Sequence, residues 1–255
     1  MNANNNVVDE EKVAMKRGIL RVDLGKDIFE NINDEVASET SLQLYINNKL
    51  FTAFICSPTK TKELVVGNLL TQGIISKPEE IKHLQIQKGK AKVKLQYETD
   101  FHQYAKEKTQ RTKASQDLTL NPEIVLNAAK MLDTKAVVFK RTGGTHAAAL
   151  LDGKGEVLAF SEDIGRHNAV DKVIGEAALK RIDLRRTWLA STGRLSSEIV
   201  TKAANVNVPV IVSLASPTDK GIEAAEKMGL TIIGFARGRR FNLYTHPERI
   251  KKMVG

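Results

Sequence analysis

Residues 187–236 read TWLASTGRLSSEIVTKAANVNVPVIVSLASPTDKGIEAAEKMGLTIIGFA, and this stretch decides the fold. Short runs rich in aliphatic residues alternate with longer segments that carry apolar residues at helical spacing. Strands are expected at 187–191, 208–214 and 230–236, with helices at 195–206 and 218–229. Strands alternating with helices at this spacing are joined by right-handed crossovers and pair in parallel. The sequence therefore predicts an α/β fold.

The residues just before this stretch extend the same domain. NPEIVLNAAKMLD (121–133) predicts a helix, AVVFK (136–140) a short strand, and HAAALL and EVLAF a hairpin around Asp152–Gly155. An α/β domain is therefore expected over residues 121–255.

The first half of the chain is predicted to be rich in strands. Hairpins are expected at 41–55, turning at Asn47-Asn48, and at 81–97, turning at Lys88-Gly89. Between them, SPTKTKELVVGNLLTQG predicts one helix that ends near Gly73. We expect a disordered tail over 1–20, because its first 17 residues are Asn-rich and charged. A smaller β-rich subdomain would span 21–120 and end in a charged linker at 98–120.

Charge and cysteine content narrow the class of protein. The net charge of +9 favours attraction to polyanions such as nucleotides, although a solvated lysine surface would explain it equally well. A single cysteine, Cys56, excludes an internal disulfide and a metal site built from clustered cysteines. No apolar run is long enough to span a membrane, and no signal peptide is visible. A cytoplasmic protein without a membrane partner is the expectation.

Loops suited to anions follow the predicted strands. In open α/β sheets, ligands bind outside the carboxyl ends of the strands. Thr192-Gly193-Arg194 follows one strand and Arg237-Gly238-Arg239-Arg240 follows another. Glycine lets the backbone approach an anion closely, and arginine binds phosphate in a bidentate manner.

The stretch SEDIGRHNAVDKVIG (161–175) is unusually dense in polar groups. A helix from about Gly165 would put apolar residues on one face, with Arg166 in its first turn. His167 and Asp171 are four residues apart, as are Asn168 and Lys172, so each pair could interact along the helix. Glu162 or Asp163 could cap it. Helical geometry alone leaves an ordinary surface helix as the alternative to a functional site.

His146, in TGGTHAAAL, raises the question of a metal. A zinc deaminase needs His-x-Glu followed by Pro-Cys-x-x-Cys, whereas residue 148 is Ala and the single cysteine lies far upstream. No zinc is expected, and a structural role for His146 remains an alternative.

Four motifs together resemble one known family. TGGTHAAAL, SEDIGRHNAVDKVIG, STGRLSSE and GFARGRRFNLYTHPERI occur in the order seen in the formate dehydrogenase accessory sulfurtransferases of the FdhD/NarQ type. The resemblance extends from about Leu42 to Ile250. It implies a cytidine deaminase-like three-layer main domain, and it favours a functional reading of EDIGRHN.

The resemblance also implies a ligand and partners. The ligand would be molybdenum bis(molybdopterin guanine dinucleotide) or its tungsten analogue, with GDP as a mimic. A cysteine desulfurase would donate sulfur, formate dehydrogenase apoenzyme would receive the cofactor, and the protein would be a homodimer without a nucleic-acid partner. The residues expected to bind the cofactor are Gly143, Gly144, His146, Glu162, Asp163, Arg166, His167, Thr192, Gly193, Arg194, Phe235, Ala236, Arg237, Gly238, Arg239 and Arg240.

One departure from the family concerns sulfur. Members carry a Cys-x-x-Cys pair before the main domain, whereas TQRTKASQDL has no cysteine. Only a thiolate suits persulfide transfer, and Cys56 lies at the end of an apolar strand, where a buried core residue is expected. Two mechanisms stay open: sulfur transfer through Cys56 or a partner's cysteine, or a cofactor chaperone without sulfur transfer. A nucleic-acid-binding module is disfavoured by the low aromatic content of 5%, and a hydrolase using His167 and Asp171 lacks a nucleophile motif.

Overall fold

The computed structural model describes residues 13–96 and 118–252, and a six-stranded sheet lies at its centre. Its strand order is β12-β11-β10-β9-β7-β8. The strands are β7 (His146–Asp152), β8 (Val157–Asp163), β9 (Thr187–Ser191), β10 (Val210–Ser213), β11 (Thr231–Arg237) and β12 (Arg240–Leu243). β9, β10 and β11 pair in parallel, whereas β7 runs antiparallel to both β8 and β9. The predicted parallel unit is confirmed.

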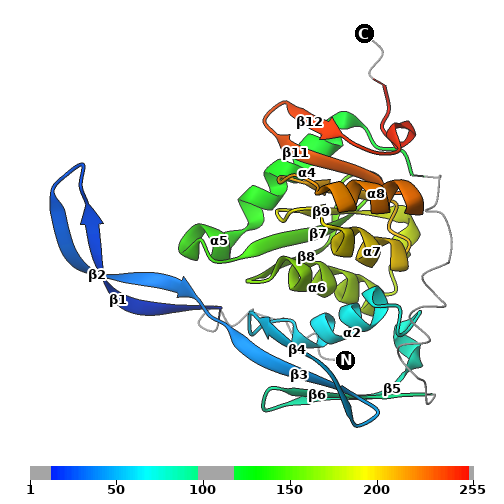
Figure 1. The fold of residues 1–255 in the computed structure, drawn as a ribbon, viewed down its shortest axis with the longest axis horizontal. Helices are drawn as coiled ribbons and strands as arrows, with labels where there is room; N and C mark the ends of the chain where they lie inside the picture. Colours follow the sequence, from blue (N-terminus) through cyan, green and yellow to red (C-terminus); the bar gives the residue numbers. More distant parts are fainter. Residues whose placement is uncertain (1–12, 97–117, 253–255) are drawn as a thin grey trace, which may run out of the picture.

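Helices cover both faces of this sheet (Figure 1). The helices are α4 (Pro122–Lys135) on one face, and α6 (Arg166–Leu179), α7 (Ser197–Asn205) and α8 (Asp219–Met228) on the other. Alternate residues of each strand point to opposite faces, so Trp188 and Val210 pack with α4, while Leu189 and Ile211 pack on the α6–α7 side. The three-layer α/β main domain is confirmed.

A smaller four-stranded sheet forms the outermost layer, in the order β4-β3-β6-β5. Its strands are β3 (Thr40–Ile46), β4 (Lys49–Cys56), β5 (Ile81–Gln87) and β6 (Lys90–Leu95), and α2 (Thr61–Thr71) packs against its inner face. Both predicted hairpins and the predicted helix are confirmed. Short 3-10 turns lie at Pro78–Glu80, Leu184–Arg186 and Pro247–Arg249.

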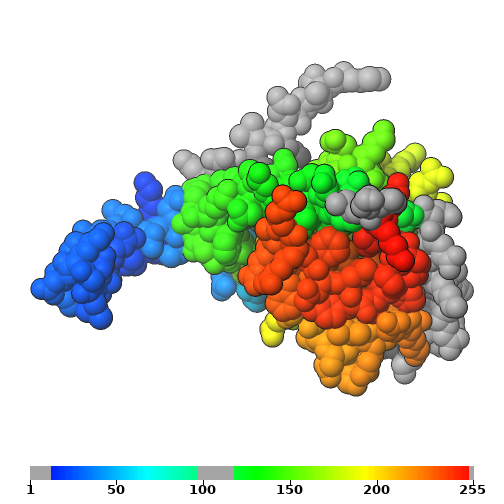
Figure 2. Space-filling view, turned by 90° about the horizontal axis from the view of Figure 1, so that it is seen from above, coloured from blue at the N-terminus to red at the C-terminus, as the bar shows by residue number. Residues whose placement is uncertain are grey.

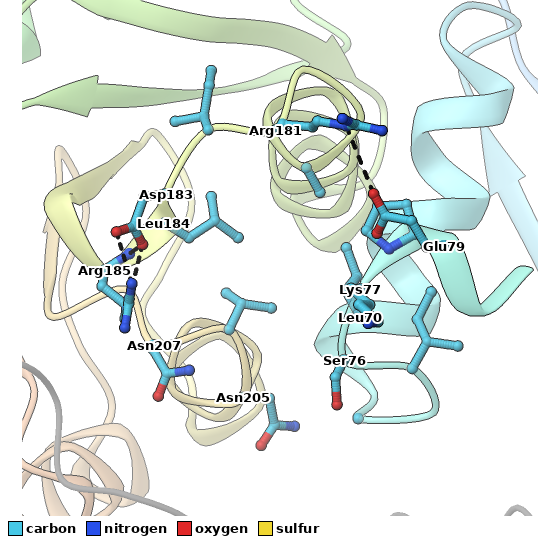
Figure 3. A pocket seen from close by; sticks show the side chains of 16 residues that line it. Leu70, Ser76, Lys77, Glu79, Arg181, Asp183, Leu184, Arg185, Asn205 and Asn207 are labelled. Atoms are coloured by element: carbon cyan, nitrogen blue, oxygen red, sulfur yellow. Dashed lines mark hydrogen bonds and ion pairs between the residues drawn. The ribbon is translucent and has the colours of Figure 1, made fainter.

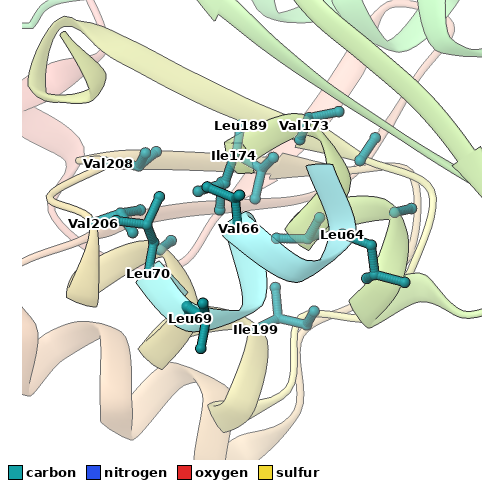
Figure 4. Close-up of a cluster of buried hydrophobic side chains, with 14 of the residues drawn as sticks. Leu64, Val66, Leu69, Leu70, Val173, Ile174, Leu189, Ile199, Val206 and Val208 are labelled. Carbon is teal, nitrogen blue, oxygen red and sulfur yellow. The ribbon is translucent and has the colours of Figure 1, made fainter. Parts of the chain in front are cut away.

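Helix α2 joins the two sheets into one core. Its leucines and valines pack among residues of α6, α7 and the central strands (Figure 4). Gly67 and Gly175 allow α2 and α6 to touch, since a Cβ on Gly67 would lie 1.8 Å from the Asp171 carbonyl oxygen. The expected boundary near residue 120 therefore does not separate two hydrophobic cores.

The predicted strand at 136–140 is wrong. These residues belong to the short helix α5 (Val137–Thr142), which ends at Gly143 with a φ of 66°. The Glu162 carboxylate accepts hydrogen bonds from the backbone N–H groups of Val138 and Phe139, at 3.0 and 2.8 Å. The Glu162 carboxylate, which comes from β8, stabilises the N-terminus of α5, and this effect outweighs the strand propensity of two adjacent valines.

A hairpin arm replaces the last part of the expected tail. β1 (Ala14–Asp23) pairs with β2 (Ile28–Ala37) over their full length, and the arm stands away from the body (Figures 1 and 2). The prediction of a disordered tail is therefore wrong for residues 14–20, which form part of β1. Residues 1–12 and 97–117, which hold the rest of the tail and most of the expected linker, lie outside the described residues.

The base of the arm is fixed to the main domain. Glu35 accepts two hydrogen bonds from the Arg141 guanidinium, each at 2.7 Å, and this bidentate pair links β2 to α5. Within the described ranges, no helix is long and apolar enough to cross a membrane.

Candidate functional site

The carboxyl ends of the central strands meet at one edge of the sheet. β8, β9, β10 and β11 all end there, and antiparallel β7 begins there, so His146 pairs directly with Asp163 in the ladder. Helices α6, α7 and α8 start from the same edge. Predicted site residues from 143–146, 162–167 and 192–194 are thereby brought to one side of the molecule.

A cavity of about 440 Å³ opens at this edge between the α5–β7 loop and the ends of β9 and β10. Four predicted residues line it: Gly143, Gly144, His146 and Thr192. Ile164, Leu214 and Phe139 make part of the wall apolar. A mostly apolar cavity with a few fixed polar groups is typical of small-molecule sites.

His146 and Thr192 form the polar corner of this cavity. The Thr192 hydroxyl lies 3.2 Å from His146 Nδ1 and accepts the Ala147 N–H at 3.0 Å. Burial, and then the positive charge of Arg166, hold the pKa of His146 below its usual value. His146 is therefore mainly neutral at pH 7 and can either donate or accept a hydrogen bond.

Arg166 lies across the loop that follows β9. Its side chain covers Gly193, where a Cβ would come within 2.8 Å of the Arg166 Cβ. This loop is held firmly, because Gly193 donates its N–H to Ser191 Oγ at 3.1 Å and Ser213 Oγ donates to the Gly193 carbonyl at 2.7 Å. Residue 193 must therefore be glycine if the Arg166 side chain is to pack against the loop.

His167 sits beside Arg166 in the first turn of α6. Burial lowers its pKa, and Arg166 and Lys202 lower it further, against a weaker opposing effect of Glu198. The Glu198 carboxylate lies 3.0 Å from His167 Nε2, but the approach lacks hydrogen-bond geometry. Glu198 is largely exposed, so solvent screens this contact and it contributes little.

Three buried polar atoms at the first turns of α6 and α7 have no hydrogen-bond partner. They are Arg166 Nε, His167 Nε2 and Ser196 Oγ. Buried polar atoms in folded proteins are nearly always paired with protein, water or ligand, so these three atoms are available to a bound group. Two of these groups can donate hydrogen bonds regardless of tautomer, and two helix N-termini add positive potential. The arrangement suits an anion such as a phosphate.

Glu162 and Asp163 position the site rather than line it. Asp163 is fully buried, and its Oδ1 accepts from the Gly165 N–H and from Asn168 Nδ2, while Oδ2 accepts from the Ser57 N–H. Glu162 binds the N-terminus of α5 and the Thr145 hydroxyl at 2.9 Å. The expected direct contact of these two carboxylates with a ligand is therefore not favoured by their packing.

The charged residues of α6 find their partners on other elements, not at the four-residue spacing along the helix. Lys172 pairs with Asp163 at 2.5 Å, and Asp171 pairs with Lys202 of α7 at 2.8 Å. Both lysines are buried, Lys172 completely, and their ammonium groups therefore pair with carboxylates of neighbouring elements. Sequence reasoning missed both pairs, since spacing along a helix does not reveal partners from other elements.

The remaining predicted residues lie further from the cavity. Arg194 is exposed before α7, and Arg237, Gly238, Arg239 and Arg240 lie on the exposed β11–β12 hairpin. Phe235 has a φ of 54° at a bulge and donates its N–H to the Ala215 carbonyl at 3.1 Å. Since Ala215 lines the cavity and Ala236 is buried, the bulge borders the site. The structure brings Gly143, Gly144, His146 and Thr192 into one cavity, with Arg166 packed on the adjacent Gly193. His167 lines a separate cavity of about 440 Å³ with Asp171 and Lys202, and the arginine hairpin is exposed.

Cys56 is buried in the core, as predicted. Its exposed fraction is 0%, and burial, followed by the negative charge of Asp163, raises the pKa of its thiol to about 11. At pH 7 only ~0.01% of such a thiol is ionised, so Cys56 is a poor nucleophile.

A larger cavity of about 630 Å³ lies at the opposite end of the helices (Figure 3). It is lined by the last turns of α2, α6 and α7 and by the segments that lead into β9 and β10. Its arginines are already paired, Arg185 with Asp183 at 2.9 Å and Arg181 with Glu79 at 3.7 Å. This cavity therefore fits an anion less well than the sheet edge does. Across residues 13–96 and 118–252, no three His, Cys, Asp or Glu side chains are grouped to hold a metal ion.

A three-layer α/β domain with a cavity at the carboxyl ends of its strands has the architecture in which α/β proteins commonly bind ligands. The FdhD/NarQ family profile matches residues 37–115 and 96–251. The chain belongs to the FdhD/NarQ family.

Relatives match over nearly the whole chain. A sulfur carrier protein FdhD of Staphylococcus haemolyticus is 39% identical, covering 94% of this chain and 97% of the relative. Another of that name from Bacillus subtilis is 34% identical, covering 95% and 99%. The crystal structure of a formate dehydrogenase accessory protein from Desulfotalea psychrophila superposes with a TM-score of 0.81 at 27% identity, covering 94% of this chain and all of that one.

Proposed function

We propose that this protein serves in the maturation of a formate dehydrogenase by holding the molybdopterin guanine dinucleotide cofactor, or its tungsten analogue, as cargo at the sheet edge. The observation that carries the proposal is the cluster of unpartnered buried atoms on Arg166, His167 and Ser196. A diphosphate offers the acceptors that these groups lack. The names of the relatives support the link to sulfur and to formate dehydrogenase.

Each part of the edge has a distinct task in this proposal. Arg166 and the N-termini of α6 and α7 would bind phosphate oxygens, with His167 donating when protonated. The neutral His146 and the Thr192 hydroxyl would orient the organic part of the cargo inside the cavity. The exposed arginines 237, 239 and 240 would attract the anion and close over it from the rim.

Sulfur transfer through Cys56 is the second mechanism, and its environment speaks against it. A persulfide carrier must present a thiolate to two other proteins, whereas Cys56 is buried and its thiol pKa is raised to about 11. The proposal therefore assigns this chain the binding and delivery of the cofactor, and it assigns the sulfur-bearing cysteine to a partner such as a cysteine desulfurase. A homodimer remains part of the proposal.

Complementation tests this function directly. A strain that lacks its own family member would express this chain, an Arg166→Gln variant or the control Arg185→Gln, which changes an arginine of the opposite cavity. Formate dehydrogenase activity should be restored by the wild type and by the control but fall at least tenfold with Arg166→Gln. Equal activity with both variants would contradict the proposed site.

Persulfide trapping separates the two mechanisms. The pure protein and a Cys56→Ser variant would be incubated with a cysteine desulfurase, pyridoxal phosphate and cysteine, alkylated, and weighed by mass spectrometry. We expect no sulfur adduct on either protein. An adduct that is absent from Cys56→Ser would make this chain a one-cysteine sulfur carrier.

A further inference from the structure

The outward face of the four-stranded sheet carries a row of lysines. Lys90, Lys92 and Lys94 alternate along β6 with buried Ala91 and Val93, so all three side chains point away from α2. We call this surface the lysine face. It comprises these lysines and their outward neighbours, which are Ser41, Gln43, Tyr45, Leu50, Ala53, Ile55, His83, Gln85 and Gln87.

The place of β6 in the sheet makes this row unusual. Lysines commonly guard edge strands against pairing with other chains. β6, however, is an inner strand, paired with β3 on one side and with β5 on the other. Protection of an edge therefore does not explain three lysines here.

No negative charge offsets the row within the sheet. None of the strands β3, β4, β5 and β6 contains an Asp or Glu. In the described part of the chain the three lysines form no ion pair, and their cross-strand neighbours on β5 are Gln87, Gln85 and His83. Like charges ~7 Å apart along a strand repel one another. A face that keeps this repulsion is suited to an external negative charge.

An apolar strip lies on the same face as the lysines, on β4, with β3 between the two. On β4, Leu50 is 58% exposed and Ile55 is 55% exposed, and their registers with Tyr45 and Ser41 put them on the same outward face. Figure 1 shows this sheet as the outermost layer, with α2 on its inner side. An exposed apolar patch with polar residues around it marks an interaction site, and an adjoining row of like charges favours a partner of the opposite charge.

We propose that the lysine face docks a protein whose surface joins an acidic patch to an apolar strip. Nucleic acid fits less well, because base stacking needs aromatic platforms, and Tyr45 at the centre of the face is engaged with Gln43 at 3.1 Å. The exposed aliphatic side chains would also find no apolar surface to pack against on a phosphate backbone. This surface is distinct from the sheet edge, and it draws on the proposed function only for the choice of test proteins.

The test compares matched charge reversals in the full chain. One variant carries Lys90→Glu, Lys92→Glu and Lys94→Glu. The control carries Lys130→Glu, Lys154→Glu and Lys227→Glu, which are exposed lysines of other elements with the same change in net charge. A third variant, Leu50→Ser with Ile55→Ser, probes the apolar strip, and a milder Lys→Gln triple at 90, 92 and 94 replaces the first if it fails to fold.

Binding would be measured by biolayer interferometry against formate dehydrogenase apoenzyme, against the cysteine desulfurase and against 20-nucleotide single-stranded DNA and RNA. We expect at least one of the two proteins to bind wild type, with at least tenfold weaker binding for the lysine-face and apolar-strip variants. The control should bind like wild type, and affinity should fall with rising salt.

Three outcomes would overturn the proposal: neither protein binds wild type, the control loses as much affinity as the lysine-face variant, or only nucleic acid binding depends on the face. GDP binding measured on the same variants keeps this test apart from the proposed function. If the lysine-face variant still binds GDP but no longer binds the protein partner, the docking surface is separate from the proposed cofactor site.

Discussion

Lys172 and Asp163 form an ion pair, 2.5 Å between nitrogen and oxygen, in which both side chains are 0% exposed. Lys172 also donates to the Ser57 carbonyl at 3.1 Å, and Asp163 accepts the Ser57 N–H at 3.0 Å. The pair thus joins the end of β8, the middle of α6 and the segment after β4. It holds the loop that presents Arg166 and His167.

Removing one member of this pair should be costly. Lys172→Met leaves the Asp163 carboxylate buried and unpaired, which is expected to lower the free energy of unfolding by about 3–5 kcal/mol. Urea unfolding followed by circular dichroism measures the change. The exposed pair Lys220–Glu223 supplies the control, since Lys220→Met should cost less than about 1 kcal/mol. A similar loss in both variants would contradict the structural importance of the buried pair.

The contact between α2 and α6 should tolerate no added methyl group. Gly67→Ala would put a Cβ 1.8 Å from the Asp171 carbonyl oxygen, so the helices must separate, at a cost of about 3 kcal/mol or more. Thermal unfolding would report this as a large fall in Tm. Gly18→Ala is the matched control, because the nearest atom to its Cβ would be 4.0 Å away. An unchanged Tm for Gly67→Ala would refute the packing described.

Cys56 should be nearly unreactive in the folded protein. With a thiol pKa of about 11 in place of the usual ~8.5, its reaction with Ellman's reagent at pH 7.5 should be more than about 100-fold slower than that of a free thiol. Burial slows it further. The same thiol should react at once in concentrated urea. Fast reaction in the native state would show that Cys56 is accessible and would reopen its use as a sulfur carrier.

The two site histidines should couple GDP binding to protons. Burial and Arg166 keep the pKa of His146 and of His167 below 6.5, so both are mainly neutral at pH 7 in the free protein. A bound phosphate would raise these values, and GDP affinity should therefore increase as the pH falls from 7.5 to 6.0. Calorimetry at both pH values measures it, and His167→Gln should reduce the dependence. Equal affinity at both pH values would place the phosphate elsewhere.

The lowered pKa values of His146 and His167 also determine how the stability of the folded protein changes with pH. Because the folded-state pKa values lie below the unfolded value of about 6.5, the unfolded chain takes up protons first on acidification. The histidine contribution to stability is thus complete above pH 6.5 and is lost as the pH falls towards the folded pKa. Urea midpoints at pH 7.5 and 5.5 should differ less for the double variant His146→Asn, His167→Gln than for wild type.

Local sequence patterns predicted most of the fold correctly. The strands at 187–191, 208–214 and 230–236 are short aliphatic runs bounded by glycine or polar turns, and periodicity identifies such runs well. The hairpin turn at Asn47-Asn48 is also predictable, because Asn tolerates the positive φ that a tight turn requires, and both residues adopt it. The pattern failed at 136–140, where Glu162, some 23 residues away, caps a helix that the valines disfavour.

The candidate site was predictable only in part. The position of Thr192 at the carboxyl end of β9 follows from the predicted parallel unit. The position of His146 depends on the antiparallel pairing of β7 with β9, which the sequence did not predict. The tertiary partners of Asp171 and Lys172, by contrast, come from α7, β8 and the segment after β4, and no spacing along α6 encodes them. The arm formed by β1 and β2 was missed because most of its residues are exposed and its strands lack the alternation that burial imposes.

GDP binding by Arg166 variants tests the central claim most directly. Isothermal titration calorimetry would compare GDP and ADP on the wild type, on Arg166→Gln and on the control Arg185→Gln. The account predicts that wild type and Arg185→Gln bind GDP in preference to ADP, and that Arg166→Gln binds it at least tenfold more weakly, since a hydrogen bond to a charged group contributes about 1.5–3 kcal/mol. Failure of the wild type to bind GDP, or unchanged affinity in Arg166→Gln, would contradict a cofactor site at this edge.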